Sequence, residues 1–110
     1  MSDGKVMRFG SVSRTDGVAG YEHYKKCHAN AWPGVNRMIK ECNLQNYSIY
    51  YFDNLLFSYY EYVGDDYEAD MAKMAADPET QRWWAEVVPC MKPFTSDSPW
   101  VDMETLYHLD

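Results

Sequence analysis

The chain has little positive charge and no long apolar run, and each shortage excludes a class of function. Ten lysine and arginine residues stand against seventeen acidic ones, a formal net charge of −7. Nucleic-acid binders instead concentrate basic residues on one surface. No stretch approaches the ~20 apolar residues of a membrane-spanning helix. The composition therefore favours a protein that acts on a neutral small molecule, with neither nucleic acid nor a membrane as partner.

Cysteine is scarce as well, and its pattern excludes a disulfide framework. The three cysteines, Cys27, Cys42 and Cys90, form no Cys-x-x-Cys pair and have no regular spacing. We expect reduced, half-buried thiols in a reducing compartment. The first residues, Met1-Ser-Asp-Gly-Lys-Val, lack the apolar run of a secretory signal. A cytoplasmic location is therefore expected.

Histidine is equally rare, and its spacing argues against a metal centre. His23 and His28 are five residues apart, whereas metal-ligand pairs on a helix lie three or four apart. Cys27 adjoins His28 and would point away from it, and no further histidine is placed to activate this thiol as a nucleophile. A glycine-rich phosphate loop is also missing. We expect no metal and no nucleotide cofactor.

What the chain does have is apolar and aromatic residues in regular patterns. Apolar residues make up 46% of the 110 residues, enough for one domain over residues 1–110 with a core of its own. Period-two and aromatic-rich runs predict four strands, at 5–13, 46–52, 55–62 and 103–109. Helical spacing predicts four helical segments, from 18 past 28, at 33–42, at 67–76, and from 78 to near 89.

This order, β-α-β-β-α-β with each helical segment split in two, predicts a fold of the α+β class. It is the ferredoxin-like arrangement, a four-stranded antiparallel sheet with helices on one face. Asp53-Asn54 is expected to form a hairpin turn, and helix caps are expected within Gly64-Asp65-Asp66 and at Asp77. The other sheet face would be aromatic and exposed, and such a surface requires a partner. We therefore expect a homodimer that buries sheet against sheet, a dimeric α/β barrel-type assembly.

His28 is the leading candidate for a catalytic residue. It follows Tyr24 by four residues and precedes Trp32 by four, so the three share one stripe if the helix continues. Imidazole titrates near physiological pH and can give or take a proton. By spacing alone, catalysis and simple packing at the sheet edge explain His28 equally well. The two other histidines are interpreted as structural: His23, elsewhere on the helix, and His108, in the last strand.

Tyr47, Trp83 and Trp84 are candidates for ligand binding. Tyr47 lies at the start of a strand, where a phenol can donate to a ligand hydroxyl, although cross-strand packing is the simpler explanation. Adjacent residues on a helix point about 100° apart. One of the two indoles can therefore face the core while the other borders a cleft and stacks on a sugar ring. Two core or interface tryptophans remain the alternative.

Taken in order, these residues resemble the L-rhamnose mutarotase family. The matching elements are Tyr24-x3-His28-x3-Trp32-Pro33, Asn46-Tyr47-x-Ile49-Tyr50, Leu55-Leu56-Phe57, Trp83-Trp84, Asp97-Ser98-Pro99 and Tyr107-His108-Leu109. They cover nearly the whole chain in one register. The resemblance implies that His28 is the proton donor and that four residues bind the sugar: Tyr24, Tyr47, Trp83 and Trp84. It also implies a ferredoxin-like homodimer without a cofactor.

The reaction implied is that of an isomerase, which interconverts the α and β anomers of L-rhamnose. The ring opens when the anomeric hydroxyl loses a proton and the ring oxygen gains one, and each proton transfer contributes about 10²–10⁴-fold. We expect protonated His28 to donate to the ring oxygen, while a tyrosine, a bound water or a carboxylate is the base.

Three alternatives to this function stay open. The departures from the family are the Met7-Arg8-Phe9-Gly10 strand, the short Asp53-Asn54 turn and Trp100. They leave L-fucose as a second candidate sugar. Because a fold does not fix a function, a dimeric ferredoxin-like monooxygenase of the antibiotic-biosynthesis type is a second alternative. A non-catalytic ligand-binding module is the third.

Overall fold

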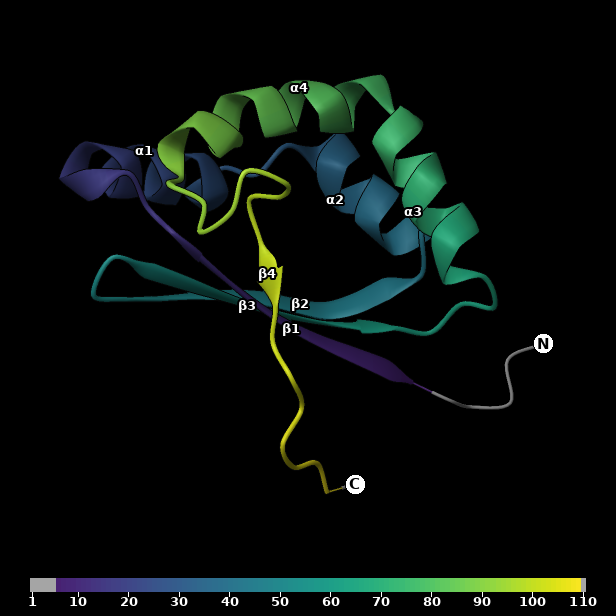
Figure 1. The fold of residues 1–110 in the computed structure, drawn as a ribbon. Coiled ribbons are helices and arrows are strands. Elements are labelled where there is room, and N and C mark those ends of the chain that lie inside the picture. Colours follow the sequence, from purple (N-terminus) through teal and green to yellow (C-terminus); the bar gives the residue numbers. More distant parts are fainter. Residues whose placement is uncertain (1–5, 110) are drawn as a thin grey trace.

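A four-stranded antiparallel sheet lies beneath a layer of helices in the computed structural model, which describes residues 6–109 (Figure 1). The strands follow the order β2-β3-β1-β4 across the sheet. The strands are β1 Met7–Arg14, β2 Leu44–Phe52, β3 Leu55–Tyr62 and β4 Val101–Asp102. The helices are α1 Gly17–Ala29, α2 Pro33–Glu41, α3 Tyr67–Ala76 and α4 Pro78–Val87, followed by the short 3₁₀ helix η1 Val88–Cys90. The predicted ferredoxin-like fold is confirmed.

Local sequence signals set several element boundaries as predicted. Asp66 and Asp77 each accept a hydrogen bond from the backbone N–H three residues later, at 3.1 and 2.9 Å. These bonds satisfy N–H groups that the first turn of a helix leaves unpaired. In the β2–β3 hairpin, Asp53 and Asn54 have φ of 51° and 66°, the left-handed conformation that a tight two-residue turn requires.

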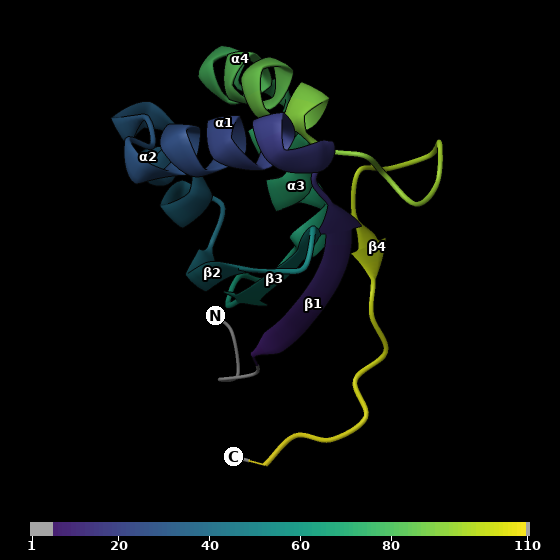
Figure 2. The same ribbon diagram turned by 90° about the vertical axis from the view of Figure 1, so that its left-hand side faces the viewer.

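The last strand is shorter than predicted and lies elsewhere. The strand consists of Val101 and Asp102, opposite Val12 and Ser11 of β1, and the Met103 N–H still donates to the Gly10 carbonyl oxygen at 2.8 Å. The predicted strand at 103–109 is therefore wrong, and the chain beyond Met103 leaves the sheet on the side away from the helices (Figure 2). Alternating apolar residues show that one side of a segment could be buried, but they do not supply a neighbouring backbone to pair with. The first strand, predicted at 5–13, is confirmed as β1, which begins at Met7 and ends one residue later, at Arg14. Lys5 lies outside the described residues.

The two faces of the sheet differ in what covers them. Ser13, Leu56 and Tyr62 point toward the helices and are at most 2% exposed. On the opposite side Tyr50 and Phe52 are 65% and 73% exposed. We call this side the open face. Its apolar side chains, placed by strand register and alternation, are Val12, Tyr50, Phe52, Leu55, Phe57 and Tyr59.

The core lies between the helices and the sheet, and it includes two of the three cysteines. All three are free thiols, but only Cys27 is half-buried as predicted, whereas Cys42 and Cys90 are buried. None of the helices in residues 6–109 is long and apolar enough to cross a membrane.

Candidate active site

His28 lies in the last turn of α1, in contact with two aromatic rings. It stacks on Tyr24, with ring centroids 4.2 Å apart, and meets the edge of Trp83 at 5.1 Å. The predicted stripe fails at Trp32, because α1 ends one residue after His28 and Trp32 has extended backbone before Pro33. A residue before proline is disfavoured in the helical conformation. Trp32 instead contacts Trp83 at 5.3 Å.

Two adjoining cavities meet at His28, between the helices and β2. The larger has a volume of about 500 Å³ and is lined by His28, Tyr47 and Trp83, among others. The smaller, about 240 Å³, is lined by Tyr24 and further aromatic side chains. His28 and Ile49 line both, and we call the two cavities together the His28 cleft. The structure thus gathers His28, Tyr24, Tyr47 and Trp83 at one cleft.

A β-bulge directs Tyr47 into this cleft. The β2–β3 register shifts between Gln45 and Ser48, so Asn46 and Tyr47 together oppose Tyr60. Asn46 has a left-handed backbone conformation, with φ of 51°, which accommodates the extra residue of the bulge. With strict alternation from Gln45, Tyr47 would point to the open face. Instead its ring stacks on Tyr60 at 5.3 Å, on the helix-covered side.

The two tryptophans of α4 have different surroundings. Trp83 is 6% exposed and lines the larger cavity, whereas Trp84 is 40% exposed and lines neither cavity. Their divergence follows from helical geometry, which rotates successive residues by about 100°. Trp83 is thus a wall of the cleft. A sugar-binding role for Trp84 stays a prediction.

The hydrogen bond of the His28 ring determines which nitrogen is available for chemistry. Nδ1 lies 2.9 Å from the Tyr24 carbonyl oxygen, which can only accept, so Nδ1 carries a proton. Within residues 6–109 Nε2 has no hydrogen-bond partner. Burial lowers the pKa of His28 below its ordinary value, and the backbone hydrogen bond offsets this only in part. The neutral ring therefore presents a lone pair at Nε2.

The phenols of the cleft are better suited to donate hydrogen bonds than to act as bases. Burial raises the pKa of Tyr24 well above its ordinary value, and the nearby Tyr47 phenol adds to the effect. Burial also raises the pKa of Tyr47. Among the described residues no aspartate or glutamate lines either cavity. Of the three bases expected from the sequence, tyrosine and carboxylate thus lose support in this cleft, which leaves water. His28 Nε2 is a further candidate that the sequence reasoning did not consider as the base.

Several polar lining residues were missed by the sequence reasoning. Asn36, Lys40 and Gln45 line the larger cavity, and Lys25 lines the smaller. The four-residue spacing of Asn36 and Lys40 on α2 was a usable signal, because such residues share a helix face. Gln45 gave none, since its position depends on the neighbouring bulge.

The fold and the cleft together define a ferredoxin-like α+β protein with a small-molecule site. A solved L-rhamnose mutarotase from Formosa agariphila superimposes with a TM-score of 0.74 at 20% identity, over 94% of this chain and 99% of that one. The tetracenomycin cyclase of Streptomyces glaucescens, a type-II polyketide cyclase, gives 0.68 at 20% identity, over 94% and 97%. At this identity both likenesses show the fold alone.

The sequence comparisons identify the family. A model of L-rhamnose mutarotase matches residues 9–109. The L-rhamnose mutarotase of Bacillus subtilis is 34% identical over 93 residues, which cover 82% of this chain and 86% of that protein. The one from Opitutus terrae is 35% identical over 98 residues, 84% and 89% of the two chains. The chain belongs to the L-rhamnose mutarotase family, and the resemblance noted from its motifs is confirmed.

Proposed function

We propose that this protein is an isomerase that interconverts the α and β anomers of L-rhamnose in the His28 cleft. The observation that carries the proposal is the position of His28 where both cavities meet, with no hydrogen-bond partner for Nε2 among the described residues. Membership in the mutarotase family supports proton transfer to and from a sugar as the role of this histidine. Neither a monooxygenase nor a non-catalytic binding module is favoured by any feature of the cleft.

In the proposed mechanism His28 moves one proton from the anomeric hydroxyl to the ring oxygen. Neutral Nε2 first accepts the hydroxyl proton, and a carbonyl forms as the bond between the anomeric carbon and the ring oxygen breaks. The imidazolium then gives the same proton to the ring oxygen. This second step is the donor role predicted from the sequence. After the aldehyde rotates, the steps reverse and the other anomer closes, so no proton is gained or lost.

The other predicted residues hold the sugar. The Tyr24 and Tyr47 phenols, protonated at neutral pH, donate hydrogen bonds to sugar hydroxyls. Trp83 offers an indole wall beside His28, suited to the apolar face of a sugar ring. For Trp84, which lines neither cavity, the sugar-binding role rests on the family resemblance alone.

The apolar lining of the larger cavity supports a 6-deoxysugar. Ala31, Val35 and Ile39 form this lining together with β2 residues. A methyl group loses no hydrogen bonds to water on entering such a surface, whereas a hydroxymethyl group does. L-Rhamnose and L-fucose both carry the methyl group, while L-mannose is the L-rhamnose analogue that carries the hydroxyl.

Saturation-transfer NMR on these three sugars tests the proposal. We expect added protein to speed anomer exchange most for L-rhamnose and least for L-mannose. A faster rate with L-fucose than with L-rhamnose would change the assigned sugar but keep the reaction. If none of the sugars exchanges faster than in buffer, the mutarotase function is refuted.

We further infer a homodimer joined through the open face. This face carries exposed aromatic residues, and beside it the C-terminal segment exposes Leu106, Tyr107 and Leu109 at 87%, 79% and 76%. Contiguous apolar surface of this kind marks an interaction site. Sedimentation equilibrium should give twice the mass of the chain.

The cytoplasmic location stays a prediction, for which the three free cysteines are the support.

A further inference from the structure

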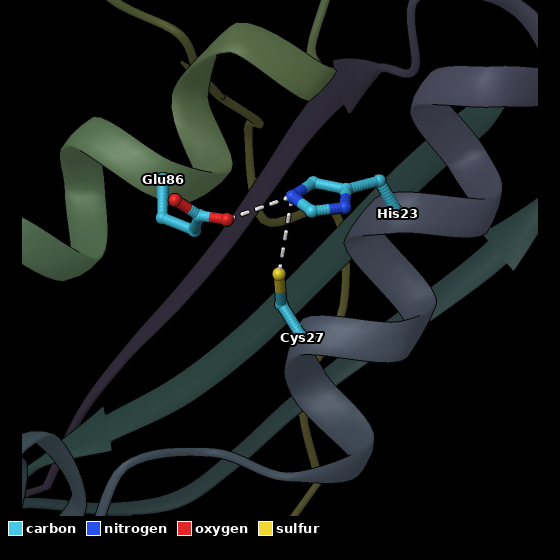
Figure 3. A group of neighbouring side chains, drawn as sticks. All are labelled: His23, Cys27 and Glu86. Atoms are coloured by element: carbon cyan, nitrogen blue, oxygen red, sulfur yellow. Dashed lines mark hydrogen bonds and ion pairs between the residues drawn. The ribbon is translucent and has the colours of Figure 1, made fainter.

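Three side chains with metal-ligating atoms meet outside the His28 cleft, where α1 packs on α4. His23 and Cys27 lie one turn apart on α1, and Glu86 faces them from α4 (Figure 3). His23 Nε2 is 2.9 Å from a Glu86 carboxylate oxygen and 3.6 Å from Cys27 Sγ. The three ligand atoms all lie within 4.8 Å of one another.

The two distances from His23 Nε2 are close to those between ligands of a tetrahedral cation. Zinc binds nitrogen and oxygen at about 2.0–2.2 Å and sulfur at about 2.3 Å, so ligand atoms around it are about 3.4–3.6 Å apart. The separation of His23 Nε2 and Cys27 Sγ, 3.6 Å, already has this value. The ion pair between His23 and Glu86 has to open by about half an ångström to admit the ion.

An exposed ion pair does not by itself account for the cluster. The His23 and Glu86 side chains are 47% and 49% exposed, and such pairs contribute only about 0–1 kcal/mol to stability. The thiol of Cys27 adds a third possible metal ligand, and it lies one turn after His23 on the same face of α1. Imidazole, thiolate and carboxylate together favour Zn²⁺ over Mg²⁺ or Ca²⁺, which prefer sites made of oxygen atoms alone.

The backbone holds the two helices close enough for this site. Gly20 lies one turn before His23, and a Cβ atom there would be 2.5 Å from the Cys90 carbonyl oxygen. Any larger residue would push α1 away from η1, which directly follows α4. The sequence alone shows the helical spacing of His23 and Cys27 but gives no sign that Glu86 lies beside them.

We propose that His23, Cys27 and Glu86 bind a thiophilic divalent cation, best fitted by Zn²⁺, which bridges α1 and α4. Water completes the coordination on the exposed side. The bridge joins the two helices that carry His28 and Trp83, so bound metal stiffens the frame of the cleft. This site does not depend on the proposed mutarotase activity.

Cobalt titration of the tag-free, reduced protein tests the site, because Co²⁺ bound to thiolate gives a charge-transfer band in the near ultraviolet. We expect the band to saturate at one Co²⁺ per chain and to be displaced by Zn²⁺. Cys27→Ser should abolish it and Glu86→Gln should weaken binding at least tenfold. The matched controls Cys42→Ser and Glu22→Gln should leave the band unchanged. A band that persists in Cys27→Ser, or no band at all, overturns the proposal.

Alkylation of the unaltered protein gives a second test that does not depend on the folding of any variant. Cys27 is half-buried, whereas Cys42 and Cys90 are buried, so iodoacetamide should modify Cys27 first. Zn²⁺ should slow this modification at least tenfold, and equal Mg²⁺ should not. Equal rates with and without Zn²⁺, measured by peptide mass spectrometry, contradict the site.

Discussion

The two faces of the sheet are built from the same strands but are used differently. On the helix-covered side, alternate residues of β2 and β3 meet a helix layer and form a cleft around His28. On the open face the intervening residues, such as Tyr50 and Phe52, are largely exposed. Aromatic residues thus serve as cleft walls on one side and form a candidate dimer surface on the other. Aromatic content alone therefore does not locate the site, and the position of a titratable group among the rings does.

The largest expected effect comes from the helix-covered side. Trp83→Ala removes a buried indole that contacts both His28 and Trp32. Replacing a buried tryptophan in this way costs about 3–5 kcal/mol of unfolding free energy. Trp84→Ala, at the exposed neighbour, should cost less than about 1 kcal/mol. Urea unfolding measures both, and equal losses would contradict the difference between the two indoles.

A charge on the open face should break the dimer and leave the monomer folded. Phe57 lies at the centre of this face, opposite Val12 and Tyr50. Phe57→Asp should raise the dimer dissociation constant at least about thirty-fold, the effect of losing about 2 kcal/mol at an interface. Sedimentation velocity measures the change, with circular dichroism as the check on folding. If the wild-type chain is a monomer at high concentration, the open face has no role in self-association.

A smaller change tests whether Tyr47 binds the sugar through its hydroxyl. Tyr47→Phe keeps the ring stacked on Tyr60 but removes one donor, which is worth about 0.5–1.5 kcal/mol. We expect kcat/KM for anomer exchange to fall about three- to ten-fold. The matched control is Tyr59→Phe, which removes a hydroxyl from the open face. An unchanged rate in Tyr47→Phe would leave Tyr47 as a packing residue only.

The smallest effect concerns acid stability. Hydrogen bonds from Tyr59, Gln45 and Asn46 lower the pKa of Glu61 to about 2. Because the folded pKa lies below the unfolded value, the stabilisation is present above pH ~4.3. It is lost as pH falls toward 2. The wild-type urea midpoint should thus fall more between pH 5 and pH 2.5 than that of Glu61→Gln. Parallel falls would show that these bonds add nothing.

Most of the fold follows from local sequence signals, whereas the misses depend on distant parts of the chain. Asp66, Asp77 and the Asp53-Asn54 turn each act within a few residues, so sequence alone places them. The strand predicted at 103–109 is wrong because an alternating pattern of apolar residues does not show whether a neighbouring strand is there to pair with. The predicted stripe failed because α1 ends at Ala29 and Trp32 is extended, although Pro33 was a visible sign that the helix would not continue.

The candidate site shows the same division. His28 and Tyr24 are one turn apart on a single helix, so their contact was predictable from spacing. Tyr47 reaches the cleft only because a bulge reverses its direction, and the bulge is defined by the partner strand β3. Glu86 joins His23 and Cys27 from a different helix, which no local pattern reveals.

The most direct test of the central claim is the anomer exchange rate of L-rhamnose with equal amounts of wild-type protein and His28→Ala. If His28 carries the proton, wild-type protein speeds the exchange in proportion to its concentration. The variant, folded by circular dichroism, should be slower by about 10²–10⁴-fold. A folded His28→Ala protein that exchanges the anomers as fast as the wild type would contradict the account.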